Sequence, residues 1–338
     1  MTPRACPSCE GSRAAVFVEE RRDHVGGVSY RLYRCSQCGL VYCDPRDPVG
    51  PEWYEKAAPR RAVETRSAPR RDARFAWFLG AGLPPGRLLD VGCGGGGFMT
   101  AASARGWTAT GVDYEERMIA LARAEGRDAY CQDFRAFLKG RSAKEFDAVV
   151  LFDVLEHDPE PRGLLAAIKP VLKRGGHIAV TLPNESRPAW FGREDFDYPP
   201  HHFTRWNVDA LRSFLQREGF TVVDLRTVGP SVRWFSEVMF YGLIAPSAVR
   251  AARRALFGPQ SEGTLTDLYA VASPAPPDAA PDGLKIYLAD PARRQRAANI
   301  FKYACRVLTY PVAAVLALAC RLRPRSGEYL YCLARYDA

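Results

Sequence analysis

A run of closely spaced glycines between two aspartates is the part of this sequence with the clearest potential for chemistry. Residues 88–97 read LLDVGCGGGG, so Asp90 stands two positions before the first glycine, and Asp113 closes the next apolar stretch. Glycine has no Cβ atom, and a backbone built from it can turn tightly and approach a ligand closely. We therefore expect a nucleotide-sized ligand at this turn.

The two aspartates indicate which ligand that is. Gly92, Gly94 and Gly97 also satisfy the G-x-G-x-x-G pattern of dinucleotide sites, so the glycines alone leave the ligand open. A carboxylate at Asp90 would repel a pyrophosphate but would attract an ammonium group. S-adenosylmethionine carries an ammonium and a sulfonium and lacks phosphate. Asp113 falls where a carboxylate can accept hydrogen bonds from both ribose hydroxyls. The pair therefore favours S-adenosylmethionine over NAD.

Two pairs of cysteines form the second constellation. Cys6 and Cys9 make one C-x-x-C motif, and Cys35 and Cys38 make another. Each motif can supply two sulfurs from a tight turn, and four thiolates match the tetrahedral coordination that zinc prefers. Such a site leaves no open coordination position, so we expect structural Zn²⁺ in a zinc ribbon over residues 1–47. A piece this small buries too little surface to fold without its metal.

The five histidines include three candidates for a general base. His157 follows Glu156 just after a predicted strand, and His201 and His202 lie in the aromatic segment 198–206. A histidine suits the removal of a proton from a hydroxyl acceptor. The segment could stack on a sugar or another planar acceptor; a packed loop is the alternative. Our order of preference for the base is His202 or His201, then His157. We expect no catalytic magnesium.

Apolar runs alternate with helix-length segments from residue 87 onward, which is typical of parallel βαβ units. Strands are predicted over residues 87–91, 108–113, 129–131, 146–152, 176–182 and 220–227. Two shorter ones are predicted in the ribbon, over 15–18 and 29–33. Helices are predicted over 116–124 and 162–172, in a basic run over about 60–79, and from an N-cap at Asn207 through 217. The segment 328–335 predicts a last strand at the sheet edge, a position for which 268–272 competes.

We expect three regions: the ribbon, a donor-binding α/β domain over 60–230 completed by 326–338, and a helical insertion over 231–325. The insertion holds two apolar stretches, 238–249 and 307–320, both shorter than the roughly 20 residues that span a bilayer. They predict buried or lid helices, with a membrane-surface segment as the alternative.

The net charge indicates the kind of binding partner, and the cysteines indicate the cellular compartment. Lys and Arg number 47 against 38 Asp and Glu, a net charge of +9 among 338 residues. This excess favours an anionic partner: a phosphorylated small molecule, a nucleic acid or a membrane surface. A solvated basic surface is the alternative. No signal peptide is visible, and ten cysteines then read as thiols and metal ligands. We expect a cytoplasmic protein, with peripheral contact at the inner membrane face as an option.

From Asp90 to Phe220 the chain resembles the class I S-adenosylmethionine-dependent methyltransferases, in the branch that includes ubiquinone and saccharide methyltransferases. The resemblance rests on seven motifs in order: LDVGCGGG (89–96), GVD (111–113), FDAVV (146–150), DVLEH (153–157), LKRGG (172–176), HFTR (202–205) and EGF (218–220). It implies an α/β, Rossmann-like, doubly wound sheet of seven strands whose last strand is antiparallel. The segment after residue 328 would supply that strand.

The resemblance also implies positions for the donor, S-adenosyl-L-methionine, at the carboxyl ends of the first four strands. Gly92, Gly94 and Gly96 would line its methionine and ribose parts, Asp90 would hold its amino group and Asp113 its ribose hydroxyls. The remaining implied positions are Asp133 at the adenine amino group, Phe134 on the adenine ring, and Phe152 and Asp153 at the same crevice. For each aspartate, a helix cap or a surface charge is the alternative.

The function predicted is methyl transfer to an oxygen, or a carbon, of a small-molecule acceptor. Residues 152–155 read FDVL where methyltransferases of amino nitrogens carry N-P-P-Y or D-P-P-Y. An N-terminal ribbon resembles that of sugar methyltransferases, which favours a saccharide, a nucleotide sugar or a lipid-linked glycan in a bacterial pathway. One alternative is an RNA methyltransferase whose ribbon docks RNA, although that group uses a Cys-Cys-Cys-His ribbon. The other is a non-enzymatic donor-binding scaffold.

Overall fold

The computed structural model describes residues 4–11, 15–23, 25–49, 72–188, 193, 197–229, 232, 236, 310–318, 325 and 327–337. The chain divides into two compact units: residues 1–56, 66–228 and 324–338 form the first, and residues 57–65 and 229–323 form the second. The ribbon and the α/β domain, which the sequence separates into two regions, thus cluster into one unit. The candidate site lies entirely in that first unit.

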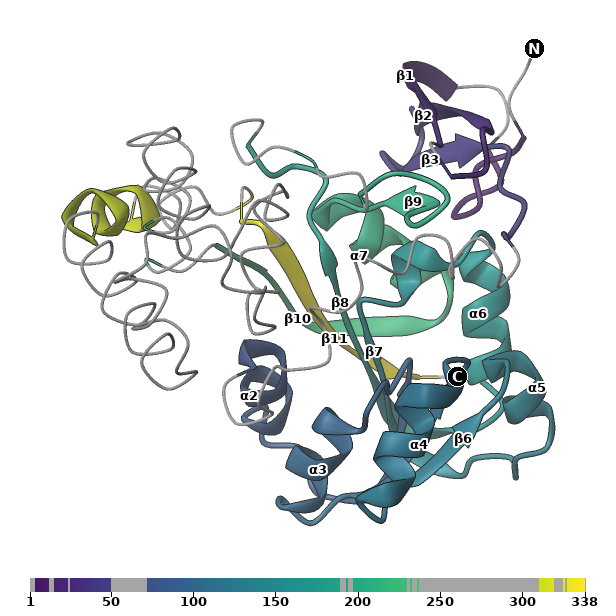
Figure 1. The fold of residues 1–338 in the computed structure, drawn as a ribbon, viewed down its shortest axis with the longest axis vertical. Coiled ribbons are helices and arrows are strands. Elements are labelled where there is room, and N and C mark those ends of the chain that lie inside the picture. Colours follow the sequence, from purple (N-terminus) through teal and green to yellow (C-terminus); the bar gives the residue numbers. More distant parts are fainter. Residues whose placement is uncertain are drawn as a thin grey trace, which may run out of the picture. The chain divides into compact units, whose positions relative to one another are not determined.

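A seven-stranded sheet is the frame of the first unit (Figure 1). Its strand order is β10-β11-β8-β7-β4-β5-β6. The bounds are β4 Arg87–Val91, β5 Thr108–Asp113, β6 Asp128–Cys131, β7 Phe146–Phe152, β8 Leu172–Pro183, β10 Phe220–Val228 and β11 Tyr329–Tyr336. Strand β11 is antiparallel to both of its neighbours, and the pairs among β4 to β8 are parallel. The predicted α/β fold with an antiparallel last strand is confirmed.

The last strand does not lie at the edge of the sheet, and that expectation was wrong. β11 lies between β8 and β10, and β10 is the edge strand. The burial pattern gives the reason: Leu330, Cys332 and Ala334 are buried, and so are the alternating Tyr331 and Leu333. A strand that is apolar on both faces belongs in the interior of a sheet covered on both sides. The competing segment 268–272 lies outside the described residues.

Helices cover both faces of this sheet, as in a doubly wound fold. Along β4, Leu88 packs with residues of α2 (Ala73–Leu79) and α3 (Gly97–Ser103). The next residue, Leu89, packs in the cluster that includes residues of α5 (Phe134–Lys139), α6 (Pro161–Ile168) and α7 (Val208–Arg217). Successive side chains of a strand point to opposite faces, which explains why the central strands read as continuous apolar runs.

Most helix predictions match the structure, but one of the predicted helices ends earlier than expected. α4 spans Glu116–Ala124 as predicted, whereas the helix predicted over 162–172 ends at Ile168. Pro170 has no N–H with which to continue the helix, and Leu172 already begins β8. In the basic run predicted helical over about 60–79, helix α2 occupies Ala73–Leu79 and residues 60–71 lie outside the described part.

A second, smaller sheet contains the ribbon strands and one strand from the α/β domain. Its order is β1-β2-β3-β9, with β1 Ala15–Arg22, β2 Ser29–Cys35, β3 Val41–Asp44 and β9 Thr204–Arg205. Strand β9 pairs antiparallel with β3, so that Val41 faces Arg205 and Tyr42 faces Thr204. The ribbon is therefore joined to the α/β domain by backbone hydrogen bonding as well as by side-chain packing, since Phe203 clusters with residues of β2 and β3.

The insertion is described only in part. Residues 310–318, within the apolar stretch 307–320, are helical, and the stretch 238–249 lies outside the described residues. In the part of the chain that the structure describes, no helix combines the length and the apolarity needed to cross a bilayer.

The predicted N-cap of α7 offers a test of this reading of the fold. The Asn207 side chain accepts a hydrogen bond of 2.8 Å from the Ala210 N–H. We expect Asn207→Ala to lower the free energy of unfolding by about 1 kcal/mol, because one N–H of the first turn loses its partner. Denaturant unfolding checks this value. Asn207→Ser keeps a capping oxygen and serves as the control; an equal loss in both variants would contradict the capping role.

Candidate active site and cysteine cluster

The glycine turn follows β4 and leads directly into α3. Gly92 has φ 74°, and Gly96, the residue that caps α3, has φ 77°. Both values lie in the left-handed region that residues with a side chain rarely adopt. A Cβ atom on Gly92 would also lie 2.8 Å from Val154 Cγ2, and one on Gly96 would lie 3.2 Å from Ala122 Cβ. The turn therefore requires glycine at these two positions.

Asp90, two residues before this turn, carries a buried carboxyl group. Its side chain lies in β4 and the residue is 3 % exposed, and Oδ2 has no hydrogen-bond partner among the described residues. Burial, reinforced by the nearby Asp113 carboxylate, raises the pKa of Asp90 to about 8. A buried carboxylate is costly unless an opposite charge or a donor faces it. This site therefore favours a cationic or hydrogen-bond-donating group from a ligand.

Asp113 closes the neighbouring strand β5 and organises the turn. Its Oδ2 accepts a hydrogen bond of 3.0 Å from the Gly94 N–H, and its Oδ1 accepts one of 2.9 Å from the Glu115 N–H. Each carboxylate oxygen can accept a second hydrogen bond, so this side chain can still receive two hydroxyls of a ligand. Asp113 thus has both a structural role in the turn and capacity for a ligand.

Asp133 and Phe134 lie at the start of α5, just after β6. Asp133 is exposed and caps the helix, accepting a hydrogen bond of 2.9 Å from the Ala136 N–H. The predicted alternative of a helix cap therefore accounts for one of its oxygens. The half-buried Phe134 ring has the Arg135 guanidinium 4.4 Å from its centroid. The backbone of this segment is tied to the donor side of the sheet, because the Gln132 N–H donates to the Asp113 carbonyl at 3.0 Å.

Phe152 and Asp153 lie at the carboxyl end of β7, and the structure adds Arg74 to them. Asp153 has φ 57°, an unusual conformation for a residue with a side chain. Its carboxylate accepts a hydrogen bond of 3.1 Å from the Thr181 hydroxyl and forms an ion pair with Arg74. Phe152 packs on Phe98 of α3, with ring centroids 4.9 Å apart. A non-glycine residue held in this conformation marks a constrained position beside the crevice.

Sequence reasoning missed Arg74. It lies in the first turn of α2, where Asp72 caps the helix and also binds the Arg74 guanidinium through Nε at 3.0 Å. The only available signal was a basic run before the first strand, which does not single out one arginine. Because it is paired with Asp72 and Asp153, Arg74 brings a fixed guanidinium to the carboxyl end of β7.

The histidine candidates gather around Glu156 in the 3-10 helix η3, Leu155–His157. Glu156 is 2 % exposed, and both of its carboxyl oxygens lack a hydrogen-bond partner among the described residues. Ligand atoms of Glu156, His157 and His202 all lie within 4.8 Å of one another. The His157 and His202 rings are 4.7 Å apart, and His157 Nδ1 is 2.9 Å from the His201 carbonyl oxygen. Two distant segments of the chain thus form one cluster, here called the Glu156 cluster.

The Glu156 cluster can support two kinds of chemistry. His202 is 6 % exposed, and burial, together with the neighbouring His157, holds its pKa well below the usual value. A neutral imidazole can accept a proton from a substrate hydroxyl. One carboxylate and two imidazoles are also a donor set for a divalent metal ion. Burial, followed by the charge of Asp153, raises the pKa of Glu156 well above its usual value, which favours the neutral acid in the protein alone.

The aromatic residues of segment 198–206 do not form the acceptor platform that we expected. Phe203 and Trp206 are 2 % and 0 % exposed, so neither ring is available to a ligand. The Tyr198 hydroxyl accepts a hydrogen bond of 3.0 Å from Arg21 of the ribbon. The reason is the pairing of β9 with β3, which turns this segment into a packed connection, the alternative raised from the sequence. His202 remains beside the buried Glu156, and His201 is half-buried.

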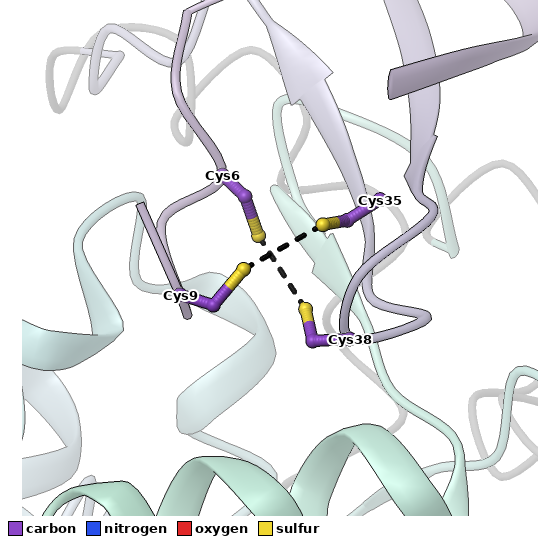
Figure 2. Close-up of side chains that lie close together, drawn as sticks. All are labelled: Cys6, Cys9, Cys35 and Cys38. Atoms are coloured by element: carbon purple, nitrogen blue, oxygen red, sulfur yellow. Dashed lines mark hydrogen bonds between the residues drawn. The ribbon is translucent and has the colours of Figure 1, made fainter. Parts of the chain in front are cut away.

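The four cysteines converge as the sequence predicts (Figure 2). Cys6 Sγ lies 3.6 Å from Cys38 Sγ, and Cys9 Sγ lies 3.6 Å from Cys35 Sγ. Ligands about 2.3 Å from a tetrahedral zinc ion would be about 3.8 Å apart. The two separations of 3.6 Å are near this value, and all four sulfurs lie within 4.8 Å of one another. A hydrogen bond from the Cys6 thiol lowers the pKa of Cys38 to about 5, which favours the thiolate that a metal binds.

Comparisons with known proteins agree with this geometry. Residues 62–225 match a family model described as a methyltransferase domain. The ubiquinone biosynthesis O-methyltransferase of Pseudomonas aeruginosa is 33 % identical over 115 residues, which cover 32 % of this chain and 50 % of that protein. That of Xanthomonas campestris is 31 % identical over 147 residues, covering 41 % and 59 %. The chain thus spans about half the length of the curated relatives it matches.

Among solved structures, the S-adenosylmethionine-dependent methyltransferase from Archaeoglobus fulgidus aligns with a TM-score of 0.45 at 18 % identity. That alignment covers 78 % of this chain and 91 % of the other. The matched segment, residues 62–225, contains the glycine turn, Asp90, Asp113 and the Glu156 cluster. Residues 62–225 are thus similar to a methyltransferase domain, an enzyme domain, and they lie on the Rossmann-like α/β fold described above.

Proposed function

We propose that this protein transfers a methyl group from S-adenosylmethionine to an oxygen, or a carbon, of a small-molecule acceptor. The observation that carries the proposal is the buried Asp90 carboxyl beside the glycine turn, with one oxygen that lacks a partner among the described residues. A donor that presents an ammonium group and no phosphate satisfies this oxygen, whereas a pyrophosphate would meet two aspartates.

The residues present fit this donor along its whole length. Asp90 faces the amino group, the turn at Gly92, Gly94 and Gly96 lines the methionine and ribose parts, and Asp113 binds the ribose hydroxyls. Asp133 and Phe134 lie at the far end, after β6, where the adenine would lie. When bound, the donor supplies an activated methyl group. The protein then has to align the acceptor with that methyl group, and alignment alone can supply much of the acceleration.

The acceptor is proposed from weaker signals. Curated relatives are named as O-methyltransferases, which supports a hydroxyl oxygen as the acceptor atom. Removal of the hydroxyl proton falls to the Glu156 cluster, with His202 or His157 as the base. The net charge of +9 favours an anionic acceptor. We propose a saccharide, in the form of a nucleotide sugar or a lipid-linked glycan, at a cytoplasmic site that includes the membrane surface.

The acceptor class can be tested with donor labelled in its methyl group. Purified full-length protein is incubated with nucleotide sugars, an organic-phase lipid extract and total RNA in separate reactions, and Asp113→Ala is the control. We expect label in the nucleotide-sugar or lipid fraction. Label confined to RNA would replace the proposed acceptor with a nucleic acid. Donor binding without label in any fraction would favour a non-enzymatic scaffold.

We also propose that Cys6, Cys9, Cys35 and Cys38 hold one structural zinc ion. Elemental analysis of the purified protein should give one zinc per chain. Cys38→Ser should lose this zinc, whereas Cys43→Ser should keep it, because the buried Cys43 thiol donates to the Pro45 carbonyl at 3.3 Å and is not part of the cluster. Wild-type protein without bound metal, prepared without chelators, would contradict the assignment.

Asp113→Ala should weaken donor binding by about 1–3 kcal/mol, through the loss of charge-assisted hydrogen bonds to the ribose. Isothermal calorimetry measures this value. Asp209→Ala, which removes an exposed carboxylate that pairs with Arg325, is the matched control and should leave the affinity unchanged. Equal affinities of Asp113→Ala and the wild type would remove Asp113 from the donor site.

Donor binding should release a proton from Asp90. Because the pKa of Asp90 is raised to about 8, its carboxyl is mostly protonated at pH 7, and a bound ammonium group favours the carboxylate. The affinity should therefore rise as the pH increases from about 6 towards 8. Calorimetry in two buffers of different ionisation enthalpy counts the released protons. Asp90→Asn should release none, and wild-type protein that releases none either would contradict this assignment.

His202→Ala should lower the turnover of methyl transfer by about 100-fold while donor affinity stays unchanged, as expected for the loss of a general base. Single-turnover kinetics and calorimetry separate the two quantities. His177→Ala, at a half-buried position in β8, provides the control. A full rate in His202→Ala would shift the assignment of the base to His157.

A further inference from the structure

The segment that carries His202 contributes residues both to the Glu156 cluster and to the ribbon sheet. Its next residues, Thr204–Arg205, form β9, the fourth strand of the ribbon sheet. His202 itself lies in the Glu156 cluster. The distance along the chain between the Glu156 cluster and the ribbon sheet is therefore a single residue, Phe203.

Backbone hydrogen bonds hold Phe203 on both sides. The Cys43 N–H of β3 donates to the Phe203 carbonyl at 3.1 Å, and the Phe203 N–H donates to the Glu156 carbonyl at 2.9 Å. Two residues earlier, the His201 carbonyl oxygen lies 2.9 Å from His157 Nδ1. The backbone of residues 201–203 thus connects a ribbon strand to the 3-10 helix that carries Glu156 and His157.

Side-chain packing also connects Phe203 to the ribbon. The Phe203 ring is buried in a cluster with Tyr30, Leu32, Val41 and Cys43, all at most 2 % exposed and all from ribbon strands. Much of the apolar contact of Phe203 therefore depends on the folded state of the ribbon.

Ion pairs fasten the strand that follows. The buried Arg205 guanidinium lies 3.3 Å from Glu19 of β1 and 3.1 Å from Glu185, which in turn lies 3.0 Å from Arg34 of β2. Ion pairs thus tie two strands of the small sheet, β1 and β2, to the segment after His202, in addition to β3, with which β9 pairs.

Two of the cysteines lie at the junction of β2 and β3, the strands that pack on Phe203. Cys35 is the last residue of β2, and Cys38 stands shortly before β3, with the Cys35 N–H donating to the Leu40 carbonyl at 2.9 Å. The metal would therefore clamp the junction of the two strands that surround Phe203. Without it, a ribbon of this size has too small a core to stay folded.

We infer that the zinc-bound ribbon is a positioning element of the active site: through Phe203 it holds His202 against Glu156 and His157. This inference rests on the proposed function and on the proposed zinc. It gives the ribbon a role inside the reaction centre instead of a separate docking role. The donor side is held by other elements, because Asp113 binds the Gly94 and Glu115 N–H groups and Asp90 lies in β4.

The experiment measures histidine accessibility in the full-length protein with and without its zinc. The protein is treated with diethyl pyrocarbonate, and modification at each histidine is followed by peptide mass spectrometry. In the zinc-bound protein His202 should be protected. After zinc removal its modification rate should rise at least tenfold, while that of His177 in β8 should change less than twofold. Donor affinity should stay within threefold.

Two results would overturn the inference. His202 could stay protected after zinc is lost, which would make the ribbon independent of the Glu156 cluster. Alternatively, zinc removal could raise the modification rate of His177 as much as that of His202 and could also abolish donor binding. That result would show general unfolding. Neither readout needs an acceptor, so a failure of the proposed acceptor class would remain distinguishable from a failure of this inference.

A substitution tests the same connection without removing the metal. Phe203→Ala should expose His202 while zinc stays bound, and Phe203→Leu, which keeps an apolar side chain, should restore much of the protection. Phe17→Ala, at an aromatic side chain of β1 that is 54 % exposed, is the control. Protection of His202 that is equal in Phe203→Ala and Phe17→Ala would contradict the role of Phe203.

Discussion

A buried carboxyl at the end of β4 is the constraint on which the donor side of this structure depends. The fold places Asp90 in the interior, next to a turn that only glycine can form, and directs no described side chain to its Oδ2. Leaving such a group buried costs stability, and a ligand that brings a positive charge recovers it. The nearby Asp113 raises the cost in the free protein and strengthens the attraction for a cation. In the proposed function, the same pair of aspartates disfavours phosphate-bearing nucleotides.

The large sheet and the small sheet position different parts of the candidate site. The large sheet brings the glycine turn, Asp113 and Asp153 to the carboxyl ends of β4, β5 and β7, which is where open α/β sheets bind their ligands. The small sheet contains β9, which begins two residues after His202. The proposed donor site, built from local turns, is thereby combined with a Glu156 cluster whose members come from segments far apart in the sequence.

Local patterns allowed much of the large sheet to be predicted from the sequence. β4, β5 and β7 have the predicted bounds, because each is an apolar run that ends at a glycine turn or an aspartate. The convergence of the four cysteines could be predicted because each C-x-x-C pair is close in sequence, and the same holds for the place of Asp90 beside the glycine turn. Asn207 was recognisable as a cap because its chemistry acts within three residues.

The rest depends on contacts between distant parts of the chain, which spacing does not reveal. The pairing of Tyr42 with Thr204 buried aromatic residues that we expected at the acceptor. The partnership of Arg74 with Asp153 has no local signature, and Glu156 and His202 come together from segments far apart in the sequence. The interior place of β11 follows from burial on both of its faces, a pattern that we read as an edge strand.

That interior place has a consequence for biosynthesis. β11 separates β8 from β10, yet the ribosome makes it long after both, since residues 229–323 belong to another compact unit. Until residues 329–336 emerge, β8 lacks one of its neighbours and β10 has none, so both strands can pair with other chains. A transcript cut short in the insertion would thus yield a product that already has its glycine turn and cysteines but is prone to aggregation.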